Sequence, residues 1–469
     1  MDLPLNVSFL QELLNTVAER GRQLLPASLR GDNDDITDLA QALVSVRGEA
    51  SGVAIARHIL NTYRELGTTE RRDFFRFLAE TIKPDDASVR RAAEAYLAAG
   101  GTEALSRLQE AVESPLQEFF RRLNLAPGAT AEIVAMRRDL LTMLPEEPSL
   151  GVVDSDLRHL LYSWFNRGFL VLRRIDWQTP AAILEKIIHY EAVHEIQGFE
   201  DLRRRLDPTD RRCFAFFHPS LVDEPLIFVE VALTDDVSDS IQSVLNEERK
   251  GAGGNPAPTV AVFYSISNCQ EGLKGISFGN FLLKQVGEEL AREQPQLKTF
   301  VTLSPVPGFV RWLAATMADD SAAIVSAADR AALQALADPG WVEEPEEDEA
   351  LKDAVLALAA HYFLIAKARD GRPIDPVARF HLGNGARLER INWQGDVSEK
   401  GLKESHGIMV NYRYDLREIE KNHEAYANSA TVAAAKPVRQ LLRATPKAKQ
   451  QAPAALPPPS RRAAASEDS

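Results

Sequence analysis

The chain has 469 residues, of which 45% are hydrophobic and 26% are charged, and its formal net charge is −14. This composition is typical of a globular protein with two or three domains. The negative charge argues against general nucleic-acid binding, which requires a basic surface, but it allows a local basic pocket. The two cysteines, Cys213 and Cys269, have no metal-ligand spacing around them, so we expect reduced thiols in a cytosolic compartment.

No segment predicts secretion or membrane insertion. The N-terminus carries acidic residues early and lacks the basic region of a secretory signal. The best uncharged apolar run, from Ala354 to Ala366, is too short to span a bilayer. The C-terminal SEDS is not a peroxisomal address. We therefore expect a cytoplasmic protein that binds neither membranes nor nucleic acids.

Residues 1–155 are predicted to form an all-α domain. Apolar residues recur there at helical spacing, and few strand patterns occur. The run Ser114-Pro115-Leu116-Gln117 carries three signals of a helix start, namely an N-cap Ser, Pro at the first helical position, and the Gln of a capping box. The segment from Leu144 to Ser155 is predicted to be a loop-like boundary. Such a bundle either packs against partner subunits or simply covers the second domain.

Residues 156–425 are predicted to form an α/β domain, because helices alternate with strand patterns rich in β-branched and aromatic residues. Beyond residue 425 the chain becomes rich in Ala, Pro, Lys and Arg, so residues 426–469 are predicted to be a disordered tail. The predicted strands are Cys213–Phe217, Leu226–Leu233, Val260–Ile266, Thr299–Leu303 and Arg387–Asn392.

The segment from Val260 to Phe309 predicts a βαβ unit. A strand is followed by a loop with Gly272 and Gly275, then by an amphipathic helix and a second strand that ends at Ser304. Because ligands of open α/β sheets collect at the carboxyl ends of strands, the loop suits a phosphate group, to which Lys274 could add a charge. The same glycines also fit a purely structural turn, since they match no phosphate-binding fingerprint.

Two further residues are candidates for chemistry. Pro305 favours an extended conformation at Ser304, although a plain turn serine has the same pattern. A serine hydrolase is not favoured, since no GxSxG motif surrounds it. His381 stands between a proline-containing turn and a predicted strand, which makes it a candidate catalytic histidine. No HExxH pair and no CxxC motif occurs, so no metal site is expected.

Long segments of the second domain closely resemble the malonyl-CoA decarboxylase family, in the family's order, from about Leu160 to Tyr414. These segments are SISNCQEGLKGISFGNFLLKQVGEEL, TLSPVPGFVRWL and FHLGNGARLERINWQGDVSEKGLKESHGIMVNYRY, and both EPLIFVEVALTDDVSDSIQ and SWFNRGFLVLRRIDW resemble the family as well. The resemblance implies an α+β fold, with a helical oligomerisation domain followed by a catalytic domain of the GNAT acetyltransferase fold.

The resemblance also implies a set of site residues. Ser304, in LSPVPGF, and His381, in FHLGNGA, match the family's catalytic pair, while Ser265, in YSIS, and Tyr414, in NYRY, match other positions of its site. Some members have a glutamate where this chain has Ser277, which could instead cap the helix. The substrate-binding residues that the resemblance implies, besides Ser304 and His381, are Lys274, Gly275, Ile276, Ser277, Phe278, Gly279 and Asn280.

The implied reaction converts malonyl-CoA to acetyl-CoA and CO₂ through a thioester enolate that is protonated at the α-carbon. Because the thioester is itself an electron sink, no metal, biotin, pyridoxal phosphate or thiamine is expected. The resemblance further implies a homo-oligomer, either a dimer or a tetramer, formed through the helical domain of a bacterial cytoplasmic enzyme. Two alternatives stay open, a GNAT-type acyl-CoA N-acyltransferase and a CoA-binding module without turnover.

Overall fold

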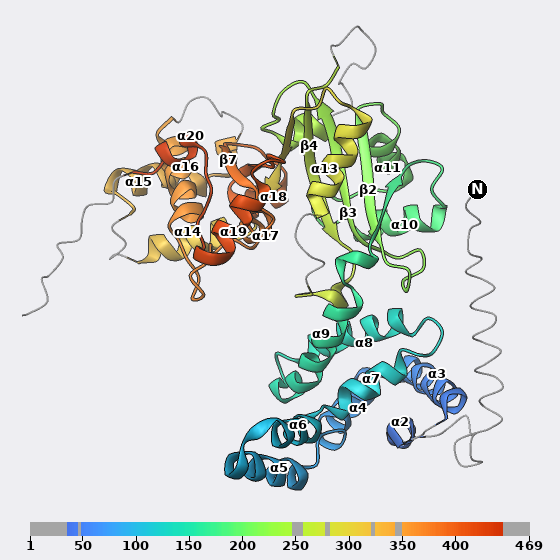
Figure 1. Cartoon of the computed structure of the whole chain (residues 1–469). Helices are drawn as coiled ribbons and strands as arrows, with labels where there is room; N and C mark the ends of the chain where they lie inside the picture. The colour runs from blue at the N-terminus through green and yellow to red at the C-terminus, as the bar shows by residue number, and fades with distance from the viewer. Residues whose placement is uncertain are drawn as a thin grey trace, which may run out of the picture.

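The computed structural model describes residues 35–45, 48–245, 257–276, 282–319, 324–342 and 349–443. Within these residues a helical part comes first, and a mixed sheet with surrounding helices follows (Figure 1). The predicted order, an all-α part ahead of a domain that combines helices with a sheet, is confirmed. In this part of the chain no helix combines the length and the apolar character that a membrane span requires.

The helical part packs around an aromatic core. Phe119 contacts Phe74 and Phe120 edge to face, with ring centroids 6.5 Å and 5.1 Å apart, and all three rings are buried. Such edge-to-face contacts are a favoured geometry for buried aromatic rings. The helices are α2 (Ile36–Ser45), α3 (Glu49–Glu65), α4 (Thr68–Thr81), α5 (Asp86–Ala99), α6 (Gly101–Val112), α7 (Pro115–Leu123), α8 (Ala129–Met143) and α9 (Gly151–Trp164).

The predicted helix start at Ser114 is confirmed, but its capping box is not formed. Helix α7 begins at Pro115 with Ser114 as its N-cap residue, yet the Ser114 side chain accepts no capping hydrogen bond. Instead, Ser114 Oγ and Gln117 Nε2 both donate to the carboxylate of Asp156 on α9, at 2.5 Å and 2.8 Å. A charged acceptor makes the stronger hydrogen bond, which explains why tertiary contact replaces the local cap.

The boundary between the two parts differs from the prediction. Residues 144–147 form a turn and Pro148–Leu150 a short 3₁₀ helix, but the chain is helical again from Gly151 to Trp164. The predicted border at residues 155 and 156 therefore falls inside α9. Val153, Leu157 and Leu161 on this helix are buried in the core, and this apolar spacing is the helical signal that the loop interpretation overlooked.

The second part is built on one mixed sheet of eight strands among the described residues, in the order β1-β2-β3-β4-β5-β8-β6, with β7 paired to β8. The five predicted strands are confirmed as β2, β3, β4, β5 and β7, and three were not predicted as strands of their own, β1, β6 and β8. The strands are β1 (Val171–Ile175), β2 (Arg211–Phe217), β3 (Pro225–Thr234), β4 (Val260–Asn268), β5 (Thr299–Thr302), β6 (Ser304–Pro305), β7 (Arg387–Asn392) and β8 (Met409–Arg413).

Helices connect the strands of this part, and the C-terminal ones gather around β7 (Figure 1). The helices are α10 (Ala181–Tyr190), α11 (Phe199–Leu206), α12 (Ile241–Leu245), α13 (Leu282–Glu293), α14 (Phe309–Ala318), α15 (Ala327–Ala332), α16 (Glu349–Leu364), α17 (Pro376–Gly383), α18 (Glu399–Ser405), α19 (Ile419–Ser429) and α20 (Lys436–Gln440).

The predicted βαβ unit is confirmed, and its two strands separate at one end. β4 and β5 run parallel, and their pairing ends at Phe263 and Thr302. Beyond that point β4 continues to Asn268. The segment that follows β5 turns away from β4 and pairs with β8 through Ser304 and Pro305. This divergence removes the strand that would otherwise fill the space beside β4, and it leaves room for a cavity inside the sheet.

The prediction of a disordered tail from residue 426 is wrong for residues 426–443. Helix α19 continues to Ser429, Ala434 pairs with Leu388 on β7, and Val438 on α20 is buried. The composition of residues 444–469 drove the prediction, and those residues lie outside the described part of the chain. Both cysteines are free and buried.

Candidate active site

Ser304 lies where β5 and β4 diverge. It comes two residues after the end of β5, forms β6 with Pro305, and is 4% exposed. Its hydroxyl donates to Thr302 Oγ1 at 2.8 Å, and Thr302 Oγ1 also accepts the backbone N–H of Tyr412 at 3.1 Å. Thr302 thereby holds the Ser304 side chain in one orientation, at the carboxyl end of the strand where the sequence predicted it.

His381 is presented to Ser304 by helix α17. The helix begins after Asp375, whose carboxylate accepts the N–H of Ala378 at 2.7 Å, and Pro376 occupies its first position. His381 is 2% exposed, and its Nε2 lies 3.1 Å from Ser304 Oγ. The Asp-Pro pair was interpreted as a turn, but an N-cap Asp followed by Pro is equally a helix start.

The hydrogen bonds around His381 assign its tautomer. Burial lowers the pKa of His381 to about 3, so the ring is neutral, and burial raises the pKa of Tyr414, so the phenol keeps its proton. Tyr414 Oη lies 2.8 Å from His381 Nδ1, and the described residues offer that phenol no other acceptor. Tyr414 therefore donates to Nδ1, and the ring proton sits on Nε2 and points at Ser304.

This arrangement is a directed chain of neutral donors, from Tyr414 to His381 to Ser304 to Thr302. In a serine hydrolase the order is reversed, because the histidine accepts the serine proton and a carboxylate orients the ring. Here the ring is oriented by a phenol and donates toward the serine. The pair is therefore built to deliver hydrogen bonds or a proton, and not to activate a nucleophile.

Ser304 and His381 face a cavity of about 230 Å³, which we call the inner cavity. The other residues that line it are mostly apolar, and they include Val193, Tyr264 and Ile266. His381 also stacks on the buried ring of Tyr412, with centroids 4.5 Å apart. In such surroundings a hydrogen bond to a developing negative charge is stronger than in water.

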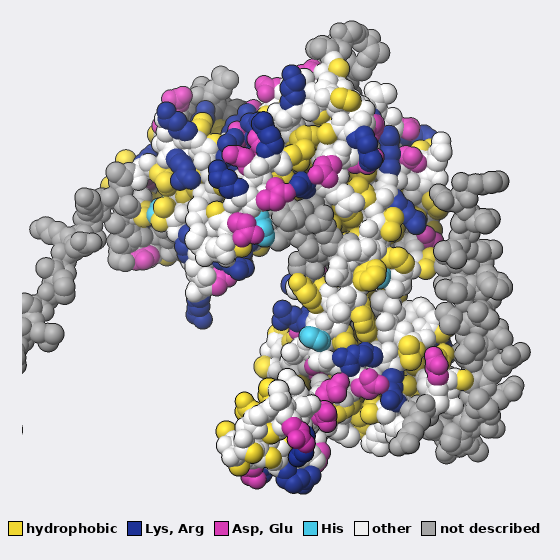
Figure 2. All heavy atoms as spheres, in the orientation of Figure 1, with side chains coloured by type: hydrophobic (Ala, Val, Ile, Leu, Met, Phe, Trp, Pro, Cys, Tyr) yellow, Lys and Arg dark blue, Asp and Glu magenta, His cyan; other side chains and the backbone are white. Residues whose placement is uncertain are grey.

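A larger cavity of about 870 Å³ adjoins the inner cavity, since Asn268 and Phe380 line both. Four cationic side chains line this basic cavity, as we call it: Arg138, Lys274, Arg372 and Arg379. Figure 2 shows the molecule hollowed between the helical part and the C-terminal elements, with Lys and Arg side chains along the edges. The two cavities together offer a site with a cationic entrance and an apolar end.

The predicted phosphate loop is described only in part. Lys274, Gly275 and Ile276 line the basic cavity, whereas Ser277, Phe278, Gly279 and Asn280 lie outside the described residues. Glycine is required at positions 275 and 272 for different reasons. Gly275 has a φ of +78°, which other residues avoid, while a Cβ on Gly272 would meet the carbonyl oxygen of Val134 at 1.9 Å.

Ser265 is not brought together with Ser304 and His381. Its hydroxyl lies within 2.8 Å and 2.7 Å of the two carboxylate oxygens of Glu191, and Ser267 Oγ donates to the same carboxylate at 3.2 Å. Ser265 is not among the residues that line the inner cavity. The structure therefore places Ser265 in a second polar cluster, formed by Glu191, Ser265 and Ser267, which we call the Glu191 cluster.

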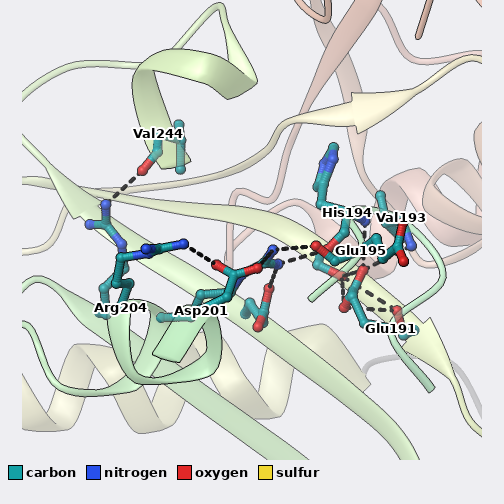
Figure 3. A network of polar contacts seen from close by, with 12 residues as sticks. Glu191, Val193, His194, Glu195, Asp201, Arg204 and Val244 are labelled. Atoms are coloured by element: carbon teal, nitrogen blue, oxygen red, sulfur yellow. Dashed lines mark hydrogen bonds and ion pairs between the residues drawn. The ribbon is translucent and has the colours of Figure 1, made fainter. Parts of the chain in front are cut away.

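The Glu191 cluster belongs to a larger polar network, in which Figure 3 labels Glu191, Val193, His194 and Glu195. Glu191 Oε1 accepts the backbone N–H groups of Val193 and His194, both at 2.8 Å. Arg205 donates to the carbonyl oxygens of His194 and Glu195, both at 2.9 Å. Because Val193 lines the inner cavity, this network determines where that wall of the cavity stands.

Sequence reasoning missed several residues that shape the site, and three illustrate why. Thr302 orients Ser304, Glu191 anchors the wall, and Arg372 lines the basic cavity. Thr302 lies two residues before Ser304, at the end of β5, so the alternation of side chains along an extended chain was a usable signal. Glu191 and Arg372 stand in no recognisable motif and meet the site only through the fold.

Both parts of the chain match family models. Residues 82–165 match the malonyl-CoA decarboxylase N-terminal domain, and residues 168–452 match the malonyl-CoA decarboxylase C-terminal domain. The chain belongs to the malonyl-CoA decarboxylase family. It is 36% identical to a mitochondrial malonyl-CoA decarboxylase of Mus musculus over 369 residues, which cover 72% of this chain and 73% of the relative. The resemblance found in the motifs is thereby confirmed.

Solved structures of bacterial members of the family have the same architecture. A malonyl-CoA decarboxylase from Rhodopseudomonas palustris is 54% identical, with a TM-score of 0.83, and the match covers 86% of this chain and 98% of that one. One from Agrobacterium vitis is 52% identical, with a TM-score of 0.82, and the match covers 87% and 100%. The described residues contain no group of three or more His, Cys, Asp or Glu side chains that could hold a metal ion.

Proposed function

We propose that this chain decarboxylates malonyl-CoA to acetyl-CoA and CO₂, with Ser304 and His381 as its catalytic pair. One observation carries the proposal: a buried histidine whose Nε2 lies 3.1 Å from Ser304 Oγ, in an apolar cavity that adjoins a cationic one. The names of its relatives, which are malonyl-CoA decarboxylases from bacteria and vertebrates, support the same reaction.

The basic cavity suits the coenzyme A part of the substrate. Its volume of about 870 Å³ is that of a pocket for a large cofactor, and phosphates are bound by Arg and Lys side chains. With the phosphates near Lys274 and Arg372, the pantetheine arm passes Asn268 and Phe380 and brings the thioester to Ser304. Binding energy from the distant nucleotide then holds the malonyl group in position for reaction.

In the inner cavity the bond between the α-carbon and the carboxylate breaks. Its electron pair moves into the thioester carbonyl and forms an enolate, and CO₂ leaves as a neutral molecule. The enolate oxygen accepts hydrogen bonds from the Ser304–His381 pair, and one such donor is worth ~3 kcal/mol of barrier lowering. The apolar walls solvate the malonyl carboxylate poorly, so its departure as CO₂ relieves an unfavourable burial of charge.

The pair then supplies a proton to the α-carbon, which gives acetyl-CoA, and the pair regains a proton from water. His381 carries a proton on Nε2 at neutral pH, and Tyr414 donates a hydrogen bond to the other ring nitrogen, Nδ1. Ser265 has no direct role in this scheme, because its hydroxyl is bound to Glu191. Thioester chemistry needs no metal, biotin, pyridoxal phosphate or thiamine, and we propose that the reaction uses none.

An assay without any amine tests the proposal. Purified protein is incubated with malonyl-CoA, and the thioesters are separated by chromatography. Formation of acetyl-CoA and CO₂ supports the decarboxylase. Product that forms only after addition of an amine acceptor would identify an N-acyltransferase, and binding of malonyl-CoA without any product would identify a CoA-binding module.

We also propose that the chain forms a homo-oligomer, a dimer or tetramer, through its helical part. Helices α5 and α6 have no buried residue, although they carry apolar side chains such as Leu97, which is 83% exposed, and Val112, which is 47% exposed. A second copy that covers this helix pair would remove these side chains from water. Light scattering on the purified protein gives the mass, and a monomer would contradict the proposal. A bacterial cytoplasmic location stays a prediction.

A further inference from the structure

Arg137 is a fully buried arginine in the helical part, and it is hydrogen-bonded to the loop that carries Gly272 and Lys274. The side chain on α8 is 1% exposed. Its Nη1 donates to the carbonyl oxygens of Gly272 and Lys274, at 2.6 Å and 3.0 Å. Its Nε donates to the carboxylate of Asp154 on α9, at 2.8 Å, and this ion pair compensates the burial of the charge.

The same loop is packed directly on α8. A Cβ at Gly272 would lie 1.9 Å from the carbonyl oxygen of Val134, so only glycine allows this approach of the two backbones. Leu273, the next residue, is buried in the core cluster that also contains Ile133 and Val134. Two independent contacts, one polar and one steric, therefore join α8 to the loop.

We propose that Arg137 is a positioning residue for the substrate, and that the helical part forms a structural wall of the ligand site beyond its role in oligomerisation. The carbonyl oxygen and the amide hydrogen of a trans peptide point in opposite directions. By holding the Lys274 carbonyl, Arg137 turns the following Gly275 N–H away from itself and fixes the backbone that lines the basic cavity.

The neighbouring residue on α8 supports this role. Arg138 lines the basic cavity, so one helix both fixes the loop and contributes a cation to the site. The inference rests on the proposed function to the extent that the ligand is a CoA thioester. The bond between Arg137 and the loop stands on the described residues alone and is measurable without any ligand.

The test compares Arg137→Met with Arg122→Met. Arg122, on α7, is a matched control in the same part of the chain: it donates to the carbonyl oxygens of Leu43 and Val44 and to Glu118, and does not line the basic cavity. Three quantities are measured, namely hydrogen exchange of the amides of residues 272–276, the Kd for CoA, and KM and kcat for malonyl-CoA.

For Arg137→Met we expect faster exchange in the loop and a rise of roughly 10–100-fold in the Kd for CoA and in KM, with a much smaller change in kcat. Arg137→Lys, which keeps the charge and can reach one carbonyl, should restore part of the affinity. Arg122→Met should leave all three quantities unchanged. If Arg137→Met does not fold, Gly272→Ala replaces it as the test. The added Cβ collides with the Val134 backbone and pushes the loop away from α8, so this variant should produce the same changes.

Unchanged exchange and unchanged CoA affinity in folded Arg137→Met would overturn the inference. Equal changes in Arg122→Met would overturn it too, because the effect would then be general destabilisation. Should the wild-type protein neither bind CoA nor consume malonyl-CoA, the proposed function fails, and hydrogen exchange alone decides whether Arg137 holds the loop.

Discussion

Two buried serines in the same sheet have hydrogen-bond partners that differ in charge. Ser304, on β6, is hydrogen-bonded to the neutral side chains of His381 and Thr302, whereas Ser265, on β4, is bonded to the carboxylate of Glu191. A hydrogen bond to a charged group is roughly twice as strong as one between neutral groups. Ser265 is therefore committed to its partner, while Ser304 can exchange a neutral partner for a substrate oxygen at small cost.

The comparison shows that burial alone does not identify a reactive side chain. Ser304 is 4% exposed and Ser265 is 1% exposed, and both stand in motifs of the family. What separates them is the charge of the partner and the presence of the inner cavity, which only Ser304 lines. We expect one serine to act in catalysis and the other to hold the wall that shapes the cavity.

His381→Asn should have the largest effect. Asparagine keeps a polar group of similar size but cannot hand a proton to carbon, so we expect kcat to fall roughly 10²–10⁴-fold. The affinity for CoA should not change, because the basic cavity is intact. Steady-state kinetics and calorimetric titration with CoA measure the two quantities, and full activity would remove His381 from the chemistry.

Ser304→Ala should come next, and Ser265→Ala is its matched control. Loss of the Ser304 hydroxyl removes a donor to the enolate, so kcat should fall roughly 10²–10³-fold. Loss of the Ser265 hydroxyl should lower kcat far less, since it reaches the cavity only through Glu191 and Val193. If the two variants lose equal activity, the distinction between the serines is wrong.

Glu191→Gln tests the Glu191 cluster at its acceptor, whereas Ser265→Ala removes one of its donors. Glu191 accepts from two hydroxyls and two backbone N–H groups. Glutamine keeps one oxygen that can accept the N–H groups, but its amide nitrogen cannot accept from the hydroxyls, and the charge that strengthens these hydrogen bonds is lost. We expect a loss of about 3 kcal/mol in the free energy of unfolding. Urea denaturation measures it, and wild-type stability would mean that the carboxylate is not needed there.

Tyr414→Phe should have a moderate effect. It removes the donor to His381 Nδ1, so the ring loses the contact that keeps its proton on Nε2. One neutral hydrogen bond is worth about 1 kcal/mol, and we expect kcat to fall by the corresponding factor of about five. A variant with unchanged kcat would show that the tautomer does not depend on Tyr414.

The pH dependence of stability should also report the burial of His381. Burial lowers the pKa of His381 to about 3, so between about pH 6.5 and pH 3 the unfolded chain binds a proton that the folded chain does not. The free energy of unfolding therefore falls as the pH falls through this window, by up to ~1.4 kcal/mol per pH unit. The decline should be shallower in His381→Asn, and equal slopes would indicate a solvated His381.

The sequence predicts the βαβ unit and the place of Ser304, because both depend on local patterns of apolar residues and proline. It does not predict by physics alone that His381 meets Ser304, since 77 residues separate them and only the fold joins β6 to α17. Family motifs supply that pairing. The role of Ser265 shows their limit, since its partner Glu191 lies 74 residues earlier in a segment without a motif.

Arg137 shows the same limit in the helical part. Its sequence surroundings, Met136-Arg137-Arg138-Asp139, resemble an exposed helix face, and charged residues of this kind are almost always at the surface. Only the approach of α8 to the loop at Gly272 reveals that Arg137 is buried and bonded. Contacts between distant segments are therefore the part of the site that sequence patterns do not contain.

The most direct measurement follows the carbon that leaves. Malonyl-CoA labelled with ¹³C in its free carboxylate is incubated with the wild-type protein and with His381→Asn, and the products are identified by NMR. We expect labelled CO₂ and unlabelled acetyl-CoA from the wild type, and unreacted malonyl-CoA from the variant. Label that stays in the thioester, appears in free malonate, or is released equally by the variant would contradict it.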